Sequence, residues 1–301
     1  MFDDLIFLAK QGDTRSIARC ISLIENDVPG YEEIVSSFSA NTTVPVIGIT
    51  GPPGAGKSTL VDALIGEYVL AQKKVAVVCV DPSSPFNMGA LLGDRIRMSK
   101  WYSHPDVFIR SLASRGSLGG LHPTTIEITD LLRNCNFDVI IVETVGVGQS
   151  EIEIAGLADL TVLVLVPEAG DEIQFMKAGL MESASLFVVN KSDRPGADRF
   201  AASLKAMLHA SGDSRFNHPN LIINTVATTG KGISELRASI DLLLLEVENV
   251  DRKVALFAKR AYRLIEKQRM LGVDQQALVK DIKDQLANKE FNLYQFIKKF
   301  N

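Results

Sequence analysis

Residues Val46–Leu64 read VIGITGPPGAGKSTLVDAL, and this stretch decides the fold. An apolar run comes first, then a Gly/Pro turn that ends in Lys57-Ser58, then a segment with the apolar spacing of a helix. The turn fits the pattern G-x-x-x-x-G-K-[ST], in which glycines let backbone N–H groups surround a phosphate while the next helix points its positive end at it. We therefore expect a nucleotide-phosphate site between a strand and a helix. The alternative is a Gly/Pro turn that simply precedes a helix.

Similar apolar runs recur along the middle of the chain. From Val44 onward these runs are VPVIGIT, VAVVCV, DVIIV, TVLVLV, LFVV and LIIN, and amphipathic segments separate most of them. Short runs without polar alternation are typical of strands buried on both faces, and their alternation with helices is the pattern of a doubly wound α/β fold. Residues 1–43 and 246–301 have helical spacing instead. The sequence therefore predicts a doubly wound, mostly parallel α/β domain at 44–245, with helical segments at 1–43 and 246–301.

The composition is that of an ordinary soluble globular protein, with 301 residues, 46% hydrophobic residues and a net charge of -4. The acidic balance disfavours a dedicated nucleic-acid-binding protein, which carries a basic stripe. Cys20, Cys79 and Cys135 are far apart in the sequence and suggest no disulfide framework. The N-terminal MFDDLIFLAKQGD is too acidic for a signal peptide, and the longest apolar stretch, IAGLADLTVLVLV, is too short to span a membrane. We expect a cytoplasmic protein with neither a nucleic-acid nor a membrane partner.

A second motif indicates which base is bound. Asn190-Lys191-Ser192-Asp193 follows the apolar run LFVV and matches N-K-x-D, a pattern of guanine-specific proteins. The carboxylate of Asp193 can accept hydrogen bonds from N1–H and from the exocyclic amine of guanine, whereas adenine would leave that buried charge unpaired. The alternative is a polar turn after a strand. A further loop toward the base is expected at Val226-Ala227-Thr228, where Val226 replaces the serine of the familiar form.

The metal side of the site is expected around Glu143, which follows the run DVIIV in DVIIVETVGVGQSE. Lys57 would bridge the β- and γ-phosphates, and the hydroxyl of Ser58 would coordinate magnesium. Asp81, which follows VAVVCV, and Asp94 are further candidates, because strand-end acids of a doubly wound sheet face the ligand crevice. Magnesium takes few carboxylates together with waters and phosphate oxygens, so some of these acids must act through water. The expected magnesium residues are Ser58, Asp81, Asp94 and Glu143.

GTP hydrolysis is expected to be slow when only this chain's own residues form the site. Small G proteins carry D-x-x-G at this place, followed by a glutamine that orients the attacking water. Here Glu143 replaces the aspartate, Val147 follows Gly146, and a valine cannot position water. Gln149 lies two residues after Val147, and whether its side chain reaches the attacking water stays open. We infer that a conformational change or a partner completes the site.

These motifs together resemble a known family, the metabolic G proteins that accompany cobalamin-dependent acyl-CoA mutases, also described as ArgK-type or LAO/AO transport kinases. The resemblance covers residues 44–245 and rests on GPPGAGKST, VDPSSPFNMGALLGDRIRM, RGSLGGL, VETVGVGQSE, GDEIQFMKAGLMESA and NKSD. It implies a P-loop GTPase that hydrolyses GTP to GDP and phosphate as the chaperone of such a mutase. The hydrolysis would be coupled to delivery of adenosylcobalamin or release of damaged cobalamin. The chain has no cobalamin-binding D-x-H-x-x-G pattern, so we expect the partner to hold that cofactor.

The resemblance also implies roles for individual residues, carried over motif by motif. Guanine is read by Asn190, Lys191 and Asp193, and magnesium is served by the four residues given above. The implied catalytic residues are Lys57, Asp94, Glu143 and Lys177. The implied phosphate-binding residues are Gly51, Pro52, Pro53, Gly54, Ala55, Gly56, Lys57, Ser58 and Thr59.

The segment EAGDEIQFMK, residues 168–177, resembles a mobile loop that in this family relays contact with the mutase to the GTP site. Asp171, Gln174 and Lys177 stand three apart, so on a helix they would share a face, and the resemblance makes them switch residues. The alternative is a solvated helix start after a strand.

Members of the family are usually dimeric through C-terminal helices, which implies a homodimer here. The segment KVALFAKRAYRLIEKQRM would supply that surface. Its shared face would consist of Val254, Phe257, Ala258, Ala261 and Leu264.

Two other functions fit parts of the sequence. A nickel-inserting GTPase needs a histidine-rich or Cys/His metal store, but the four histidines are scattered and none has a cysteine at ligand spacing. A GTP-dependent scaffold, whose GTP turnover is incidental, stays open as an alternative because Val147 stands at the water-positioning place. A partner should accelerate hydrolysis by a chaperone but not by a scaffold. The group that stabilises the transition state also stays open, because several cations qualify and a partner could supply one. The candidates are Arg95, Arg97, Arg110, Arg115 and Lys177.

Overall fold

The computed structural model describes residues 2–38, 43–81, 98–113, 121, 124–144, 150–167, 181, 184–210, 221–245, 250–270, 275–287 and 291–298. The chain divides into two compact units, Met1–Lys253 and Val254–Asn301. The segment boundaries expected from the sequence, at 43 and 245, stay predictions.

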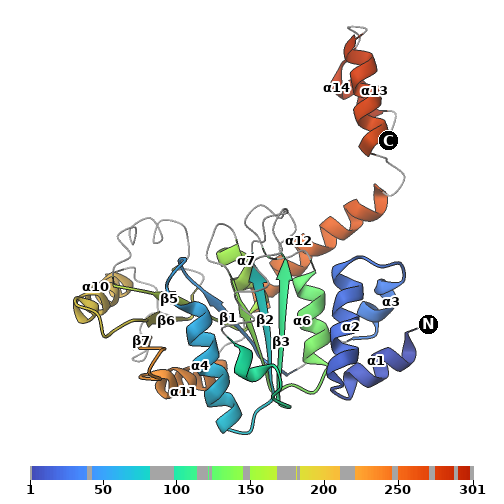
Figure 1. Cartoon of the computed structure of the whole chain (residues 1–301). Coiled ribbons are helices and arrows are strands. Elements are labelled where there is room, and N and C mark those ends of the chain that lie inside the picture. Colours follow the sequence, from blue (N-terminus) through green and yellow to red (C-terminus); the bar gives the residue numbers. More distant parts are fainter. Residues whose placement is uncertain are drawn as a thin grey trace. The chain divides into compact units, whose positions relative to one another are not determined.

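The first unit is built on one sheet of seven strands in the order β3-β2-β4-β1-β5-β6-β7, with β1 in the middle (Figure 1). All pairs between neighbouring strands are parallel. The prediction of a doubly wound parallel α/β fold is thereby confirmed. The strands are β1 (Val46–Thr50), β2 (Val75–Asp81), β3 (Val107–Ala113), β4 (Val139–Glu143), β5 (Leu160–Leu165), β6 (Leu186–Val189) and β7 (Ile222–Asn224).

Helices cover both faces of this sheet (Figure 1). On one face, Ile47 and Ile49 of β1 belong to the same buried cluster as Leu60 and Leu64 of α4 and Leu236 of α11. The helices of this unit are α1 (Asp3–Lys10), α2 (Thr14–Glu25), α3 (Tyr31–Ser36), α4 (Lys57–Leu70), α6 (Thr125–Arg133), α7 (Ser150–Leu157), α10 (Ala197–Ala210) and α11 (Ile233–Leu244), with a short 3-10 turn η1 (Ser99–Trp101).

The opposite face of β1 carries Gly48, where α7 approaches the strand closely. A Cβ atom at Gly48 would lie 2.6 Å from Cγ1 of Ile154 and 3.0 Å from Cβ of Ala158. Only glycine lets the helix come this near. Further along the sheet, Phe187 of β6 packs in a second cluster with Phe200 of α10. Strands buried on both faces explain why their sequences show continuous apolar runs.

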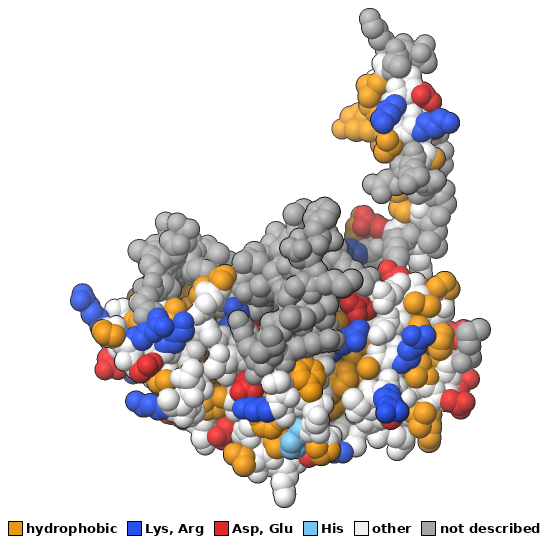
Figure 2. Space-filling model, viewed as in Figure 1, with side chains coloured by type: hydrophobic (Ala, Val, Ile, Leu, Met, Phe, Trp, Pro, Cys, Tyr) orange, Lys and Arg blue, Asp and Glu red, His pale blue; other side chains and the backbone are white. Residues whose placement is uncertain are grey.

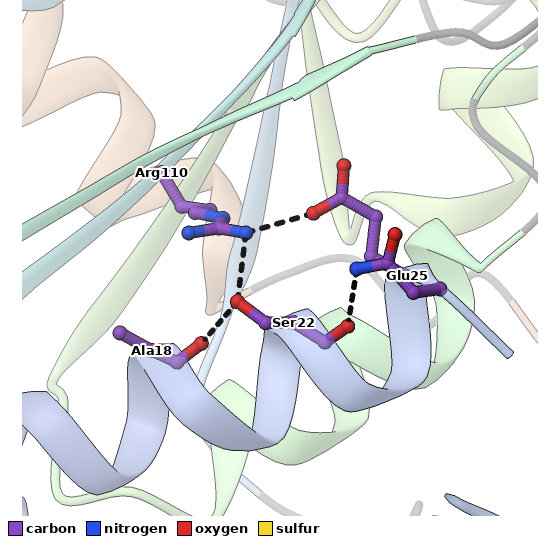
Figure 3. Close-up of polar contacts among 5 residues, drawn as sticks. Ala18, Ser22, Glu25 and Arg110 are labelled. Atoms are coloured by element: carbon purple, nitrogen blue, oxygen red, sulfur yellow. Dashed lines mark hydrogen bonds and ion pairs between the residues drawn. The ribbon is translucent and has the colours of Figure 1, made fainter. Parts of the chain in front are cut away.

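The N-terminal helices pack against the rest of this unit: α2 contacts α6 and β3, and α3 contacts α6. Figure 3 shows the polar part of this contact. Arg110 of β3 donates through Nη2 to Glu25 Oε2 at 2.8 Å and to Ser22 Oγ at 3.1 Å. Ser22 in turn donates to the carbonyl oxygen of Ala18 at 2.9 Å (Figure 3). The guanidinium that the sequence offered as a transition-state candidate is therefore engaged in joining α2 to β3.

None of the three cysteines forms a disulfide, and all three are buried. Burial raises the pKa of the Cys20 thiol to about 11 and that of the Cys135 thiol to about 12. These two thiols therefore stay protonated at neutral pH and act as small apolar side chains.

The C-terminal helices are α12 (Val250–Arg269), α13 (Gln275–Ala287) and α14 (Leu293–Ile297). On α12, Val254, Phe257, Tyr262 and Ile265 are 60%, 41%, 65% and 49% exposed. No helix in the part of the chain that the structure describes is long and apolar enough to cross a membrane.

Candidate nucleotide-binding site

The loop between β1 and α4 has the backbone of a phosphate loop. Gly51, Gly54 and Gly56 have φ angles of 141°, 77° and 87°, a region that side chains rarely adopt. A Cβ atom at Gly51 would lie 2.1 Å from the carbonyl oxygen of Val164 on β5, so the chain can turn here only without a side chain. Gly56 is the N-cap of α4, whose N-terminus therefore points at the loop. The remaining loop residues expected to contact phosphate are Pro52 and Ala55, both buried, exposed Pro53, and half-buried Thr59 in the first turn of α4.

Lys57 lies inside this loop, and only 6% of it is exposed. Its ammonium donates to the carbonyl oxygens of Gly51 at 2.8 Å and Pro52 at 3.0 Å. Because the ammonium is fixed beside the loop's backbone, a phosphate in the loop would meet a positive charge already in place.

Ser58 and Glu143 meet directly at the ends of α4 and β4. The Ser58 hydroxyl donates to Glu143 Oε1 at 2.6 Å, and Glu143 is 7% exposed. The parallel register sets Glu143 opposite Ile49, one residue before the end of β1. A hydroxyl beside a carboxylate is a pair of hard oxygen donors, which suits magnesium. These two expected magnesium residues are therefore brought together.

The other two expected magnesium residues are less fully described. Asp81 ends β2, and only its backbone is described, whereas Asp94 lies outside the described residues. Within the described part of the chain, no three His, Cys, Asp or Glu side chains form a metal-binding group.

Asn190 connects the guanine motif to the phosphate loop. Its side chain is 2% exposed, and Nδ2 donates to the carbonyl oxygen of Ala55 at 2.8 Å. Its Oδ1 accepts from the Thr225 hydroxyl at 3.1 Å and from the Ala227 backbone N–H at 3.2 Å. One buried amide therefore holds three loops at fixed separations, which makes the phosphate and base halves of the site a single unit.

Lys191 and Asp193 complete the motif at the surface. Lys191 has a φ of 56°, unusual for a residue with a side chain, and its ammonium donates to the carbonyl oxygen of Gly54 at 2.7 Å. The Ser192 N–H donates to the carbonyl oxygen of Thr225 at 3.0 Å. Asp193 is exposed, and among the described residues nothing bonds its carboxylate. Its acceptor oxygens are therefore accessible, and its predicted role in reading guanine stays a prediction.

The remaining predicted residues divide into two groups. Val226 and Ala227 are buried beside Asn190, whereas Thr228 is exposed on the same loop. The others lie outside the described residues: Asp94, Arg95, Arg97, Arg115, Gly146, Val147, Gln149, Asp171, Gln174 and Lys177.

Two residues of this site were not predicted from the sequence. Thr225, which is fully buried, orients Asn190; its place directly after the run LIIN was the available signal. Cys79, whose thiol lies 4.0 Å from Glu143 Oε2, gave no signal in the sequence.

We expect Gly56→Ala to weaken GDP binding by about tenfold or more, because the new methyl group collides with the residue that joins the loops. A Cβ atom at Gly56 would lie 2.4 Å from Nδ2 of Asn190. Calorimetric titration with GDP measures the loss. Gly196→Ala is the matched control, because Gly196 has the same φ of 87° but a Cβ atom there would meet no atom within 4 Å. Equal GDP affinity in both variants would contradict the collision.

Comparison with known proteins gives one family. The family model described as "Methylmalonyl Co-A mutase-associated GTPase MeaB" matches residues 17–284. A predicted GTPase of Pyrococcus horikoshii is 50% identical over 237 residues, which cover 78% of this chain and 75% of that protein. A fused isobutyryl-CoA mutase of Cupriavidus metallidurans is 40% identical over 192 residues, or 62% of this chain and 17% of that protein.

Among solved structures, a LAO/AO transport system kinase matches with a TM-score of 0.65 and 24% identity. The match covers 99% of this chain and 96% of that one, and at this identity it supports the fold alone.

Proposed function

Because the chain belongs to the MeaB family of methylmalonyl-CoA mutase-associated GTPases and is therefore a GTPase, we propose that it is the magnesium-dependent chaperone of an adenosylcobalamin-dependent acyl-CoA mutase. In this role it would work in the cytoplasm and gate the loading of the cofactor and the removal of damaged cofactor. One observation carries the proposal: a fused isobutyryl-CoA mutase is 40% identical to this chain over 192 residues. A segment similar to this GTPase, within the same polypeptide as a mutase, supports a working partnership between the two.

The phosphate side of the proposed mechanism uses Lys57, Ser58 and Glu143. The ammonium of Lys57 would face the β- and γ-phosphates, where negative charge accumulates during transfer. A hydroxyl can offer a lone pair to a metal while its proton is donated elsewhere, and Ser58 donates to Glu143 at 2.6 Å. Magnesium, when bound, would neutralise the phosphate oxygens. Glu143 thus orients the hydroxyl for the metal.

The base side selects the nucleotide. Asn190 holds the base loop against the phosphate loop through Ala55 and Ala227, so the distance between the two halves is fixed before GTP arrives. The exposed carboxylate of Asp193 would accept the two N–H groups on the Watson–Crick edge of guanine.

Turnover without a partner is proposed to be slow because Val147 stands where a water-positioning glutamine is usual. The mutase would complete the site through Asp171, Gln174 and Lys177, the switch residues implied by the family resemblance. A partner-completed site couples hydrolysis to the presence of the client.

The chaperone is proposed to act as a homodimer through α12. The apolar residues Val254, Phe257 and Ile265 of this helix are all at least 41% exposed. Figure 2 shows hydrophobic side chains on the surface of the described C-terminal helices. Exposed apolar side chains at helical spacing suit a second copy of the same helix.

The proposed function is tested by GTP turnover with and without added cobalamin-dependent mutases. We expect slow basal turnover that rises on the order of tenfold or more with one acyl-CoA mutase, because the partner completes the site. Lys177→Ala should abolish this rise. Lys205→Ala, a change of an exposed lysine on α10, should keep both.

Two results would contradict the proposal. If neither methylmalonyl-CoA mutase nor isobutyryl-CoA mutase changes the rate of GTP hydrolysis, the proposed chaperone function is wrong. A mutase that binds only the GTP form without accelerating hydrolysis would favour a GTP-dependent scaffold.

A further inference from the structure

A buried thiol lies against the carboxylate that orients Ser58. The Sγ atom of Cys79 is 4.0 Å from Oε2 of Glu143, whereas the hydroxyl of Ser58 is 2.6 Å from Oε1. Each carboxylate oxygen thus faces a donor from a different element: β2 supplies the thiol and α4 supplies the hydroxyl.

The sheet register fixes this arrangement. Cys79 of β2 and Glu143 of β4 are partners in the parallel ladder, so their side chains leave the sheet on the same face. That face packs against α4, because Cys79 shares a buried cluster with Leu60 and Leu64. Cys79 is 2% exposed and Glu143 is 7% exposed. The contact is therefore shielded from water and depends on the strand pairing.

A thiol at this position limits the motion of the carboxylate. The terminal torsion of a glutamate side chain is broad, so each contact on a carboxylate oxygen narrows the range of planes that the carboxylate adopts. A thiol is a weak hydrogen-bond donor that also fills apolar volume. It therefore favours one orientation of the carboxylate plane without drawing the carboxylate away from Ser58 and the metal.

We propose that Cys79 is a positioning residue that holds the plane of the Glu143 carboxylate, and through it the Ser58 hydroxyl, in the orientation that magnesium-bound nucleotide requires. This inference rests on the proposed use of magnesium at Ser58 and Glu143. Outer partners of metal-site groups commonly set metal affinity in this way.

The test measures GDP affinity by calorimetry, once with magnesium and once with EDTA. Cys79→Val replaces the donor with an apolar side chain that is only slightly larger, so GDP affinity in magnesium should fall by about threefold to tenfold and stay unchanged in EDTA. Cys79→Ser keeps a donor and should lie between Cys79→Val and the wild type. Cys135→Val is the matched control, since Cys135 is another fully buried thiol that donates to a carbonyl, that of Leu131 at 3.1 Å.

The outcomes separate a positioning role from a structural one. Equal losses in magnesium and in EDTA, or a loss shared by Cys135→Val, would overturn the inference. Cys79→Ala provides the same comparison if the valine variant unfolds. A wild type whose GDP affinity is the same with magnesium and EDTA would overturn the magnesium assignment as well. If magnesium raises the GDP affinity of the wild type and the Cys79 variants have that same affinity, only the role of Cys79 is overturned.

Discussion

Asp193→Asn is expected to change the base preference of this GTPase from guanine to xanthine. The carboxylate of Asp193 is exposed at the base end of the site and accepts only, which suits the two N–H groups of guanine. An asparagine amide offers one acceptor and one donor, and it would turn its donor toward the guanine amine. We expect GTP affinity to fall on the order of a hundredfold to a thousandfold, because two charge-assisted bonds are lost or mismatched.

Xanthine carries a carbonyl where guanine carries the amine, so the asparagine amide fits it. Xanthosine triphosphate should therefore bind the variant more tightly than GTP does, and turnover of both triphosphates measures the change. Asp198→Asn, the same charge change at an exposed residue of α10, should leave the preference for GTP intact. An Asp193→Asn variant that still prefers GTP would show that another residue reads the base.

Lys57→Ala is expected to lower the rate of GTP hydrolysis by about a hundredfold to a thousandfold. The ammonium is held by two carbonyls of the phosphate loop and is 6% exposed, so it contributes a fixed, poorly hydrated charge where the phosphates bind. Water that replaces it would have to reorient in each turnover.

Single-turnover hydrolysis at saturating GTP measures this effect on the chemical step. GDP affinity should fall less than GTP affinity, because the γ-phosphate is one of the two groups that the lysine bridges. Lys73→Ala, which removes an exposed lysine paired with Asp138, should leave both unchanged. A Lys57→Ala variant with an unaltered rate would place the catalytic charge elsewhere.

Much of the fold could be predicted because strands that are buried on both faces of a sheet have continuous apolar sequences. The runs VIGIT, VAVVCV and VIIV are strands β1, β2 and β4 because helices cover both sides of the sheet. The position of Glu143 at the end of a strand also predicted its nearness to Ser58, since parallel strands end at one edge of the sheet.

Contacts that depend on strand order could not be predicted in the same way. Cys79 meets Glu143 because β4 pairs with β2, and the chain gives no local sign of that pairing. Arg110 joins α2 because an N-terminal helix packs on an edge strand far along the sequence. The role of Asn190 as a link among three loops likewise depends on where β6 and β7 stop. Local periodicity contains no information about such distant partners.

The strand order also determines when the nascent protein can benefit from GTP. The ribosome completes β1 and β2 before β4, yet β4 lies between them in the finished sheet. Until Val139–Glu143 has emerged, both earlier strands have an open row of N–H and C=O groups that another nascent chain could pair with. Asn190 and Thr225 emerge later still, so a bound nucleotide can stabilise the joined phosphate and base loops only after both residues have been made.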